Sequence, residues 1–225
     1  MKALSQRLRT IAALVPKGAR ACDIGCDHGY LAIYLTKNDI ASSVIATDLN
    51  EAPLQRARKN IEKLSADNID LRLCDGLSGI QNNEVDTVII AGMGGNVISG
   101  IIDRCSFAKN NALTFILQPT TSAEALREYL CQNGFEILSE AVVYENNKLY
   151  SVMVSKFANS TDITDEGFYY IGRVTPDTPD GLKYIKKQQK RLLAAAEALK
   201  NIPEKENDYK HFLSSYNYIT KILAE

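Results

Sequence analysis

Acidic residues and glycines recur at four places where a short apolar segment of the sequence ends. The first is Asp23–Tyr30, which reads Asp-Ile-Gly-Cys-Asp-His-Gly-Tyr, and the others are Asp48, Asp75–Gly76 and Gly92–Gly95. Glycines at a strand-to-helix turn let a ligand approach the backbone closely. Asp48 lies 23 residues beyond the first of these glycines, about where nucleotide sites place a carboxylate that accepts from both ribose hydroxyls. Together the four places predict a site for a nucleotide-containing ligand.

The acidic residues of the first loop favour one kind of nucleotide over another. A dinucleotide site needs glycine at the second position of Gly-x-Gly-x-x-Gly, where backbone meets pyrophosphate, and here that position is Asp27. S-Adenosylmethionine has no phosphate, and its amino-acid end carries an ammonium and a carboxylate. We expect Asp23 and Asp27 to pair with the ammonium, and the following helix N-terminus to favour the carboxylate. Asp75 is expected to accept from the adenine amino group, and an NAD site is the less favoured alternative.

Strand-like and helix-like patterns alternate through residues 1–157. Strands are expected at Ala21–Ile24, Ser43–Thr47, Ile69–Leu73, Thr87–Ala91 and Leu113–Leu117. Helices are expected at Tyr30–Lys37, Glu51–Ser65, Gly95–Cys105 and Ser122–Asn133. This alternation predicts an α/β fold with a doubly wound, mainly parallel sheet. All four acidic or glycine-rich turns would then lie at the carboxyl edge of the sheet, where open α/β folds bind ligands.

The last part of this region has a different pattern. Phe135–Tyr144 and Leu149–Phe157 flank the turn Glu145–Lys148, which predicts a β-hairpin at the antiparallel edge of the sheet. The polar segment Ala158–Asp165 reads as a linker. We therefore expect a catalytic, ligand-binding domain over residues 1–157.

Residues 158–225 are expected to contain a linker and a helical hairpin. Apolar positions recur at spacings of three and four from Leu182 to Leu199 and again from Tyr209 to Leu223, with Pro203 between them. This predicts two helices packed antiparallel as a coiled coil. From Leu182 to Lys200 there are six cations and one anion, although the whole chain has a net charge of −1. A charge run of this kind either contacts nucleic acid or is a solvated helix face.

Composition and cysteine usage exclude several protein classes. The 225 residues are 45% hydrophobic, which predicts a packed core, and they contain no apolar run long enough to cross a membrane. Arg7 and Arg9 interrupt the N-terminal apolar patch, so we expect an amphipathic helix in a cytoplasmic protein rather than a signal peptide. The five cysteines form no Cys-x-x-Cys pair, which predicts reduced thiols and no metal site.

Several motifs are similar to those of one bacterial enzyme family. Asp-Ile-Gly-Cys-Asp-His-Gly-Tyr-Leu, Ile-Ala-Gly-Met-Gly-Gly and Ile-Leu-Gln-Pro resemble the tRNA adenine-22 N1-methyltransferases (the TrmK family), as do Leu4–Leu8 and the C-terminal hairpin. The resemblance covers nearly the whole chain, although the family usually has Asn where this chain has Thr120. It implies a Rossmann-like class I methyltransferase that uses S-adenosyl-L-methionine and methylates N1 of adenine 22 in the D-arm of tRNA.

The resemblance also implies which residues hold the cofactor. These are Asp23, Gly25, Asp27, Asp48, Asp75 and Gly92. Their neighbours in the same turns are expected to complete the site: Cys26, His28, Leu49, Gly76, Ala91 and Met93.

N1 of adenine already has a lone pair, so positioning can supply much of the rate without a strong base. The ring becomes cationic, and acceptors or π faces near the cofactor would stabilise the transition state. The candidates are Asp27, His28, Tyr30, Gln118 and Pro119. The simpler alternatives are a structural hydrogen bond for His28 and core packing for Tyr30.

Because N1 lies on the Watson–Crick edge, a paired adenine must leave its partner before it reacts. Contacts with tRNA phosphates are expected from Arg7, Arg9, Lys183, Lys186, Lys187, Lys190 and Arg191. The protein is expected to act as a monomer. The alternatives are a methyltransferase for another RNA, a protein or a small molecule, or a non-catalytic RNA-binding protein that keeps a cofactor pocket.

Overall fold

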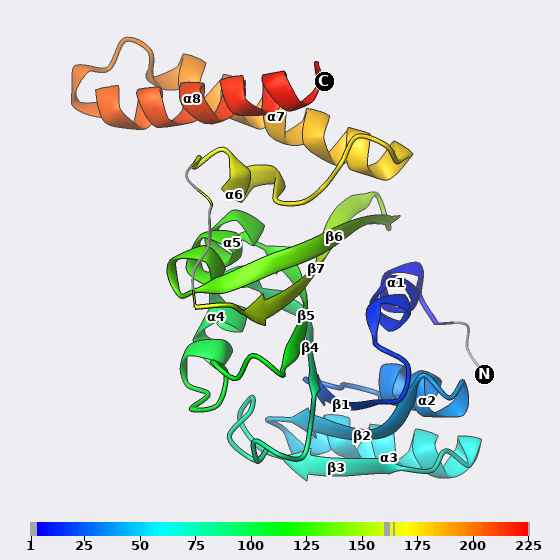
Figure 1. Cartoon of the computed structure of the whole chain (residues 1–225). Coiled ribbons are helices and arrows are strands. Elements are labelled where there is room, and N and C mark those ends of the chain that lie inside the picture. Colours follow the sequence, from blue (N-terminus) through cyan, green and yellow to red (C-terminus); the bar gives the residue numbers. More distant parts are fainter. Residues whose placement is uncertain (1–3, 160–162, 164, 225) are drawn as a thin grey trace.

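The computed structural model describes residues 4–159, 163 and 165–224. Seven strands form one mixed sheet in the order β3-β2-β1-β4-β5-β7-β6 (Figure 1). The strands are β1 (Ala19–Ile24), β2 (Ala41–Asp48), β3 (Ile69–Leu73), β4 (Thr87–Gly94), β5 (Thr114–Thr121), β6 (Phe135–Glu145) and β7 (Lys148–Phe157). The first five run parallel, and β7 pairs antiparallel with both β5 and β6. The doubly wound fold and its antiparallel edge are confirmed.

Helices cover both faces of the sheet, as Figure 1 shows. These are α1 (Gln6–Leu14), α2 (Tyr30–Lys37) and α3 (Glu51–Leu64) on one face and α4 (Gly95–Asp103) and α5 (Ala123–Gln132) on the other. The later helices are α6 (Phe168–Ile171), α7 (Pro179–Leu199) and α8 (Glu206–Ile222), with a short 3₁₀ helix at Pro203–Lys205. Alternate residues of the central strands enter different cores, because side chains of a strand point to opposite faces. On β4, Val88 and Ile90 pack with α4 and α5, and Ile89 packs with α1, α2 and α3.

β4 and β5 continue several residues past the carboxyl ends expected from sequence. The segment Gly92–Gly94 continues β4 instead of forming a turn, and α4 begins at the next residue. The pairing with β5 shifts around Met93, so this end of β4 is bulged. Gly92 has φ +80° at the bulge, a backbone conformation that favours glycine. β5 likewise continues to Thr121, and Gln118 and Pro119 are therefore strand residues.

The turn between β6 and β7 has two residues, Asn146 and Asn147, with φ of +50° and +60°. Two successive residues with positive φ are typical of the type I′ turn, whose twist matches antiparallel strands. The turn brings Glu145 at the end of β6 close to α1, since the backbone N–H of Arg7 donates to Glu145 Oε1 at 3.0 Å. The edge hairpin thus contacts the N-terminal helix.

Helices α7 and α8 pack side by side above β6 (Figure 1). Ile185 and Leu192 of α7 and Ile219 of α8 are buried in their shared core, as the spacing predicts. The same core includes Tyr184 of α7 and α6, which the sequence did not predict, and it extends to Val142 and Leu149 of the edge hairpin. The expected linker Ala158–Asp165 lies partly outside the described residues.

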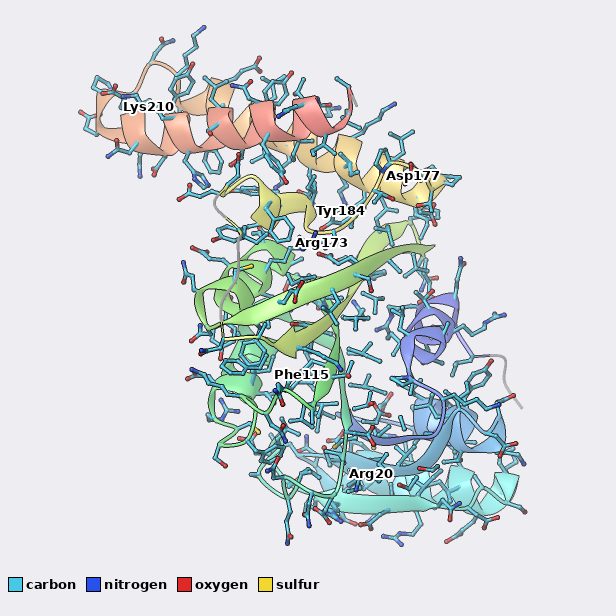
Figure 2. All side chains as sticks on the ribbon, in the orientation of Figure 1. Arg20, Phe115, Arg173, Asp177, Tyr184 and Lys210 are labelled. Carbon is cyan, nitrogen blue, oxygen red and sulfur yellow. The ribbon has the colours of Figure 1, made fainter. Side chains whose placement is uncertain are left out.

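A buried ion pair joins the helical hairpin to the sheet. Arg127 of α5 and Glu140 of β6 have fully buried side chains and form an ion pair of 2.7 Å. The Arg127 guanidinium also donates to the backbone carbonyls of Tyr169 and Tyr170 and to the Tyr184 hydroxyl. Figure 2 shows Tyr184 between α7 and the sheet. Burial lowers the pKa of Arg127, but the charges and hydrogen bonds of Glu140 and Tyr184 together raise it by more, so the guanidinium stays charged.

Candidate active site

The carboxyl ends of β1 and β4 border a cavity of about 280 Å³. Its lining is Arg7, Leu8, Asp23, Gly25, Cys26, Asp27, His28, Tyr30, Leu31, Ala91 and Gly92. The structure therefore brings most of the first acidic loop together with the end of β4. The loop is shaped by positive φ at Gly25 (+73°) and Gly29 (+69°). Gly25 is favoured at this position because of its positive φ, and a Cβ there would also lie 2.5 Å from Cε of Met93, so that the methionine side chain would have to move.

Asp23 is a buried acid without a partner. Its side chain faces the cavity at the end of β1, and the residue is 4% exposed. No group in the described part of the chain donates a hydrogen bond to it or pairs with it. Burial raises its pKa to about 7, and the nearby Asp48 contributes to the rise. A buried carboxyl group left unpaired at a cavity is suited to bind a cationic ligand group.

Asp27 has a different environment from the one expected. Its side chain is exposed, and it pairs with Arg56 of α3 at 3.2 Å and with His28 Nε2 at 3.6 Å. From the sequence we expected Asp27 to pair with the ammonium of the cofactor, but Arg56 supplies a counter-charge from another helix. A role of Asp27 in binding the ammonium stays a prediction.

His28 and Tyr30 stack at the edge of the cavity. Their ring centroids are 5.5 Å apart, with an angle of 22° between the ring planes. The backbone carbonyl of His28 accepts from the Asn60 amide of α3 at 2.9 Å, which fixes the loop against that helix. Cys26 is buried, and burial with the nearby Asp23 and Asp48 raises the pKa of its thiol to about 12. A neutral thiol is a poor nucleophile and a poor metal ligand.

Gln118 and Pro119 lie at the end of β5, beside β4. The Gln118 side chain is fully buried, and its Oε1 accepts from the Gly92 N–H at 3.1 Å and from Nη1 of Arg7. Its Nε2 donates to the Pro119 carbonyl at 2.7 Å. These bonds hold the amide in one orientation. The expected contact of Gln118 with the target base stays a prediction. Thr120 donates its hydroxyl to the Met93 carbonyl at 3.1 Å.

The remaining cofactor candidates lie farther along the sheet edge. Asp48 ends β2 and accepts from the Asn50 N–H at 3.0 Å, and the adjacent Leu49 side chain is largely exposed. Asp75 and Gly76 line a larger cavity of about 690 Å³ that follows α4 and contains neither Asp23 nor the glycine loop. Arg104, the residue that follows α4, reaches Asp75 at 3.4 Å. Like Arg56, Arg104 was missed because no sequence motif connects it to its acidic partner.

The expected RNA contacts divide into paired and exposed cations. Arg7 is turned inward toward Gln118 and Glu145. Lys183 pairs with Asp180 at 3.7 Å and Arg191 with Glu124 at 2.9 Å. Arg9 is exposed and donates to the Leu4 carbonyl at 2.8 Å. The exposed cations of α7 for which the described residues offer no ion-pair partner include Lys186, Lys187 and Lys190.

The described residues contain neither a membrane span nor a metal cluster. Within residues 4–159, 163 and 165–224, no helix is long and apolar enough to cross a membrane. The same residues contain no group of three or more His, Cys, Asp or Glu side chains arranged to hold a metal ion.

Comparisons with known proteins agree with this geometry. A methyltransferase domain model matches residues 4–153. The tRNA (adenine(22)-N(1))-methyltransferase of Bacillus subtilis is 36% identical over 165 residues, which are 73% of this chain and 69% of that protein. The crystal structure of the B. subtilis m1A22 tRNA methyltransferase TrmK has a TM-score of 0.84 at 27% identity and covers 99% of both chains. A Streptococcus pneumoniae structure in complex with S-adenosyl-L-methionine has a TM-score of 0.80 at 29% identity, covering 98% of this chain and all of that one.

Proposed function

We propose that this chain, which belongs to the tRNA (adenine(22)-N(1))-methyltransferase family, transfers a methyl group from S-adenosyl-L-methionine to N1 of adenine 22 in tRNA. The observation that carries the proposal is the buried, unpaired carboxyl group of Asp23 at the glycine-lined cavity. A methyltransferase cofactor with an ammonium group provides the cation that this position lacks.

The residues at the sheet edge fit this cofactor. Asp23 would hold the ammonium, Gly25 and Gly92 leave room for close approach of the ligand, and Asp48 would accept from the ribose hydroxyls. Asp75 would accept from the adenine amino group after the Arg104 side chain moves away from it. The exposed Leu49 side chain offers an apolar surface for the base. When bound, the cofactor supplies a methyl group activated by the sulfonium to which it is attached.

The target base needs orientation more than deprotonation, because N1 of adenine carries a lone pair. We place the stacked rings of His28 and Tyr30 at the entry to the cavity, where their π faces can contact an unpaired adenine and the positive charge that develops on it. Gln118 acts as a positioning residue, since its hydrogen bonds fix the end of β4 and Arg7. Methyl transfer to N1 therefore requires no strong base among the residues that line the cavity.

The tRNA backbone would contact the outer face of α7. Lys186, Lys187 and Lys190 lie at helical spacings on the side opposite the buried residues Ile185 and Leu192. Phosphate neutralisation by such a face adds affinity that falls as salt rises. A cytoplasmic location and a monomeric state stay predictions.

The test is the identity of the product. The purified protein, S-adenosylmethionine and tRNA from a strain lacking the enzyme should yield 1-methyladenosine on digestion and mass spectrometry, and free adenosine should not be methylated. Transfer to tRNA with adenine 22 replaced should fall to background. Formation of N6-methyladenosine, methylguanosine or a methylated protein would contradict the proposal even if cofactor binding were confirmed.

A further inference from the structure

The amino-acid end of the proposed cofactor is a zwitterion, and the cavity offers one buried anion, Asp23, for its ammonium. The carboxylate of the same end needs a cation or a set of hydrogen-bond donors. Arg7 is the one residue among the described lining of this cavity whose side chain carries a positive charge at every working pH. Its guanidinium therefore provides the charge opposite to Asp23 within the same cavity.

Arg7 is held in place before any ligand arrives. Its Nη1 donates to Oε1 of the buried Gln118, and its Nε lies 3.7 Å from Oε2 of Glu145. The guanidinium carbon lies 5.8 Å from the ring centroid of Tyr150. A guanidinium has five N–H donors in a rigid fork, so these contacts leave donors free for an anion. Fixing the side chain in advance lowers the entropy lost on binding.

Arg7 also lies against the strand end that borders the cavity. A Cβ on Gly92 would be 3.5 Å from Nη1 of Arg7, and the Gly92 N–H shares the same Gln118 oxygen. The Arg7 side chain is 24% exposed, which suits a cavity wall better than a surface contact with phosphates. The charge, orientation and burial of Arg7 all favour a small anionic group inside the cavity.

We propose that Arg7 binds the carboxylate of the methionine portion of S-adenosylmethionine, with Gln118 and Glu145 as its positioning residues. The inference rests on the proposed cofactor but not on the proposed tRNA substrate. It replaces the sequence-based expectation that Arg7 contacts tRNA phosphate. It also reassigns the carboxylate from the N-terminus of α2, where the sequence pattern suggested it, to a side chain on α1.

The test compares two ligands that differ only in the carboxylate. Affinities of the full chain for S-adenosylmethionine and for its decarboxylated analogue are measured by calorimetry in the absence of tRNA. For Arg7→Gln and Arg7→Lys, we expect S-adenosylmethionine to bind about 10- to 100-fold and a few-fold more weakly, respectively. The decarboxylated analogue should bind each variant as it binds the wild type. Lys59→Gln, on the exposed face of α3, is the control and should change neither affinity.

Three results would overturn the assignment. The first is equal weakening of both ligands in Arg7→Gln, which would mean that Arg7 only shapes the cavity. The second is unchanged binding of both ligands with weaker tRNA binding, which would restore the phosphate contact. The third is a wild type that binds both ligands equally. If thermal unfolding without ligand shows that Arg7→Gln is misfolded, the two ligands are compared on Arg7→Lys instead. Absence of any binding of S-adenosylmethionine to the wild type would instead contradict the proposed function.

Discussion

Two regions of this molecule bury an ionisable side chain, but only one of them provides that side chain with hydrogen-bond and charge partners. Arg127, between the sheet and the helical hairpin, has a carboxylate, two backbone carbonyls and a tyrosine hydroxyl around it. Asp23, at the cavity, has no such partner among the described residues, and burial raises its pKa to about 7. A buried charge with every partner supplied by the protein is part of the structure. One without a partner costs stability and is explained by a ligand that completes it.

The largest effect on stability should come from removing one partner of the Arg127–Glu140 ion pair. Arg127→Met leaves Glu140 buried without its partner, and we expect the free energy of unfolding to fall by about 3–5 kcal/mol in urea denaturation. Replacing Glu140 by Met as well removes both charges and should recover much of that loss. A double variant as unstable as the single one would show that packing, not the ion pair, stabilises this junction.

This junction also affects how the hairpin can be tested. Deleting residues 176–225 would remove Tyr184 and uncover the core that Val142 and Leu149 share with α7. We therefore expect such a truncation to destabilise the edge of the sheet as well as to remove the lysine face. Point substitutions on the outer face of α7 separate these two effects.

Removing the charge of the unpartnered acid, Asp23, should weaken ligand binding without lowering the stability of the fold. Asp23→Asn keeps the shape of the side chain but removes the charge, and we expect cofactor affinity to fall about 10- to 100-fold in calorimetry. Because the pKa of Asp23 is raised in the folded state, its ionisation as the pH rises from about 4 to about 7 lowers the free energy of unfolding. At pH 8 the Asn variant should therefore be at least as stable as the wild type. Asp86→Asn, just before β4, is the control and should leave affinity unchanged. Loss of stability without loss of affinity would contradict the assigned role of Asp23.

The comparison between charges with and without partners also applies to the exposed cations on the surface of α7. Replacing Lys186, Lys187 and Lys190 by Ala should weaken tRNA binding about tenfold at low salt. The slope of its salt dependence should fall by about one for each phosphate that is no longer neutralised. The matched control removes three cations from the far part of the hairpin, Lys200, Lys205 and Lys210. Figure 2 places Lys210 near its outer end. Equal effects of both triples, measured by filter binding over a salt series, would show that only net charge matters.

The smallest effect should be the pH dependence of cofactor binding. The ammonium pairs with ionised Asp23, whose pKa is about 7, so binding below that pH must first release a proton. Affinity should rise about fourfold from pH 6.5 to pH 8 and then level off. Calorimetry in buffers of different ionisation enthalpy would show the released proton. Affinity that is flat with pH in the wild type would mean that Asp23 is already ionised without ligand.

The sequence by itself determined the elements, the sheet edge and the nature of the ligand. Strand-helix alternation and the paired apolar spacings located α2 and β3 residue for residue and the other expected ranges to within a few positions, because side-chain periodicity reports directly on which face is buried. The short helix α6 was not expected. The acidic and glycine-rich turns were confirmed as neighbours where they follow adjacent parallel strands, as at Asp23 and Gly92. Whether each of these residues contacts the cofactor stays a prediction.

Only the tertiary structure decided which charges have partners. Arg56 reaches Asp27 from α3, Arg104 reaches Asp75 from the end of α4, and Arg127 joins Glu140 beneath α7. These partners lie 13 to 29 residues apart in sequence. Arg7 and Gln118, which are 111 residues apart in sequence, meet at one strand end. Local periodicity contains no information about such pairs, because they form only when separate elements pack and their long side chains turn toward a common point. That packing distinguishes the partnered Arg127 from the unpartnered Asp23.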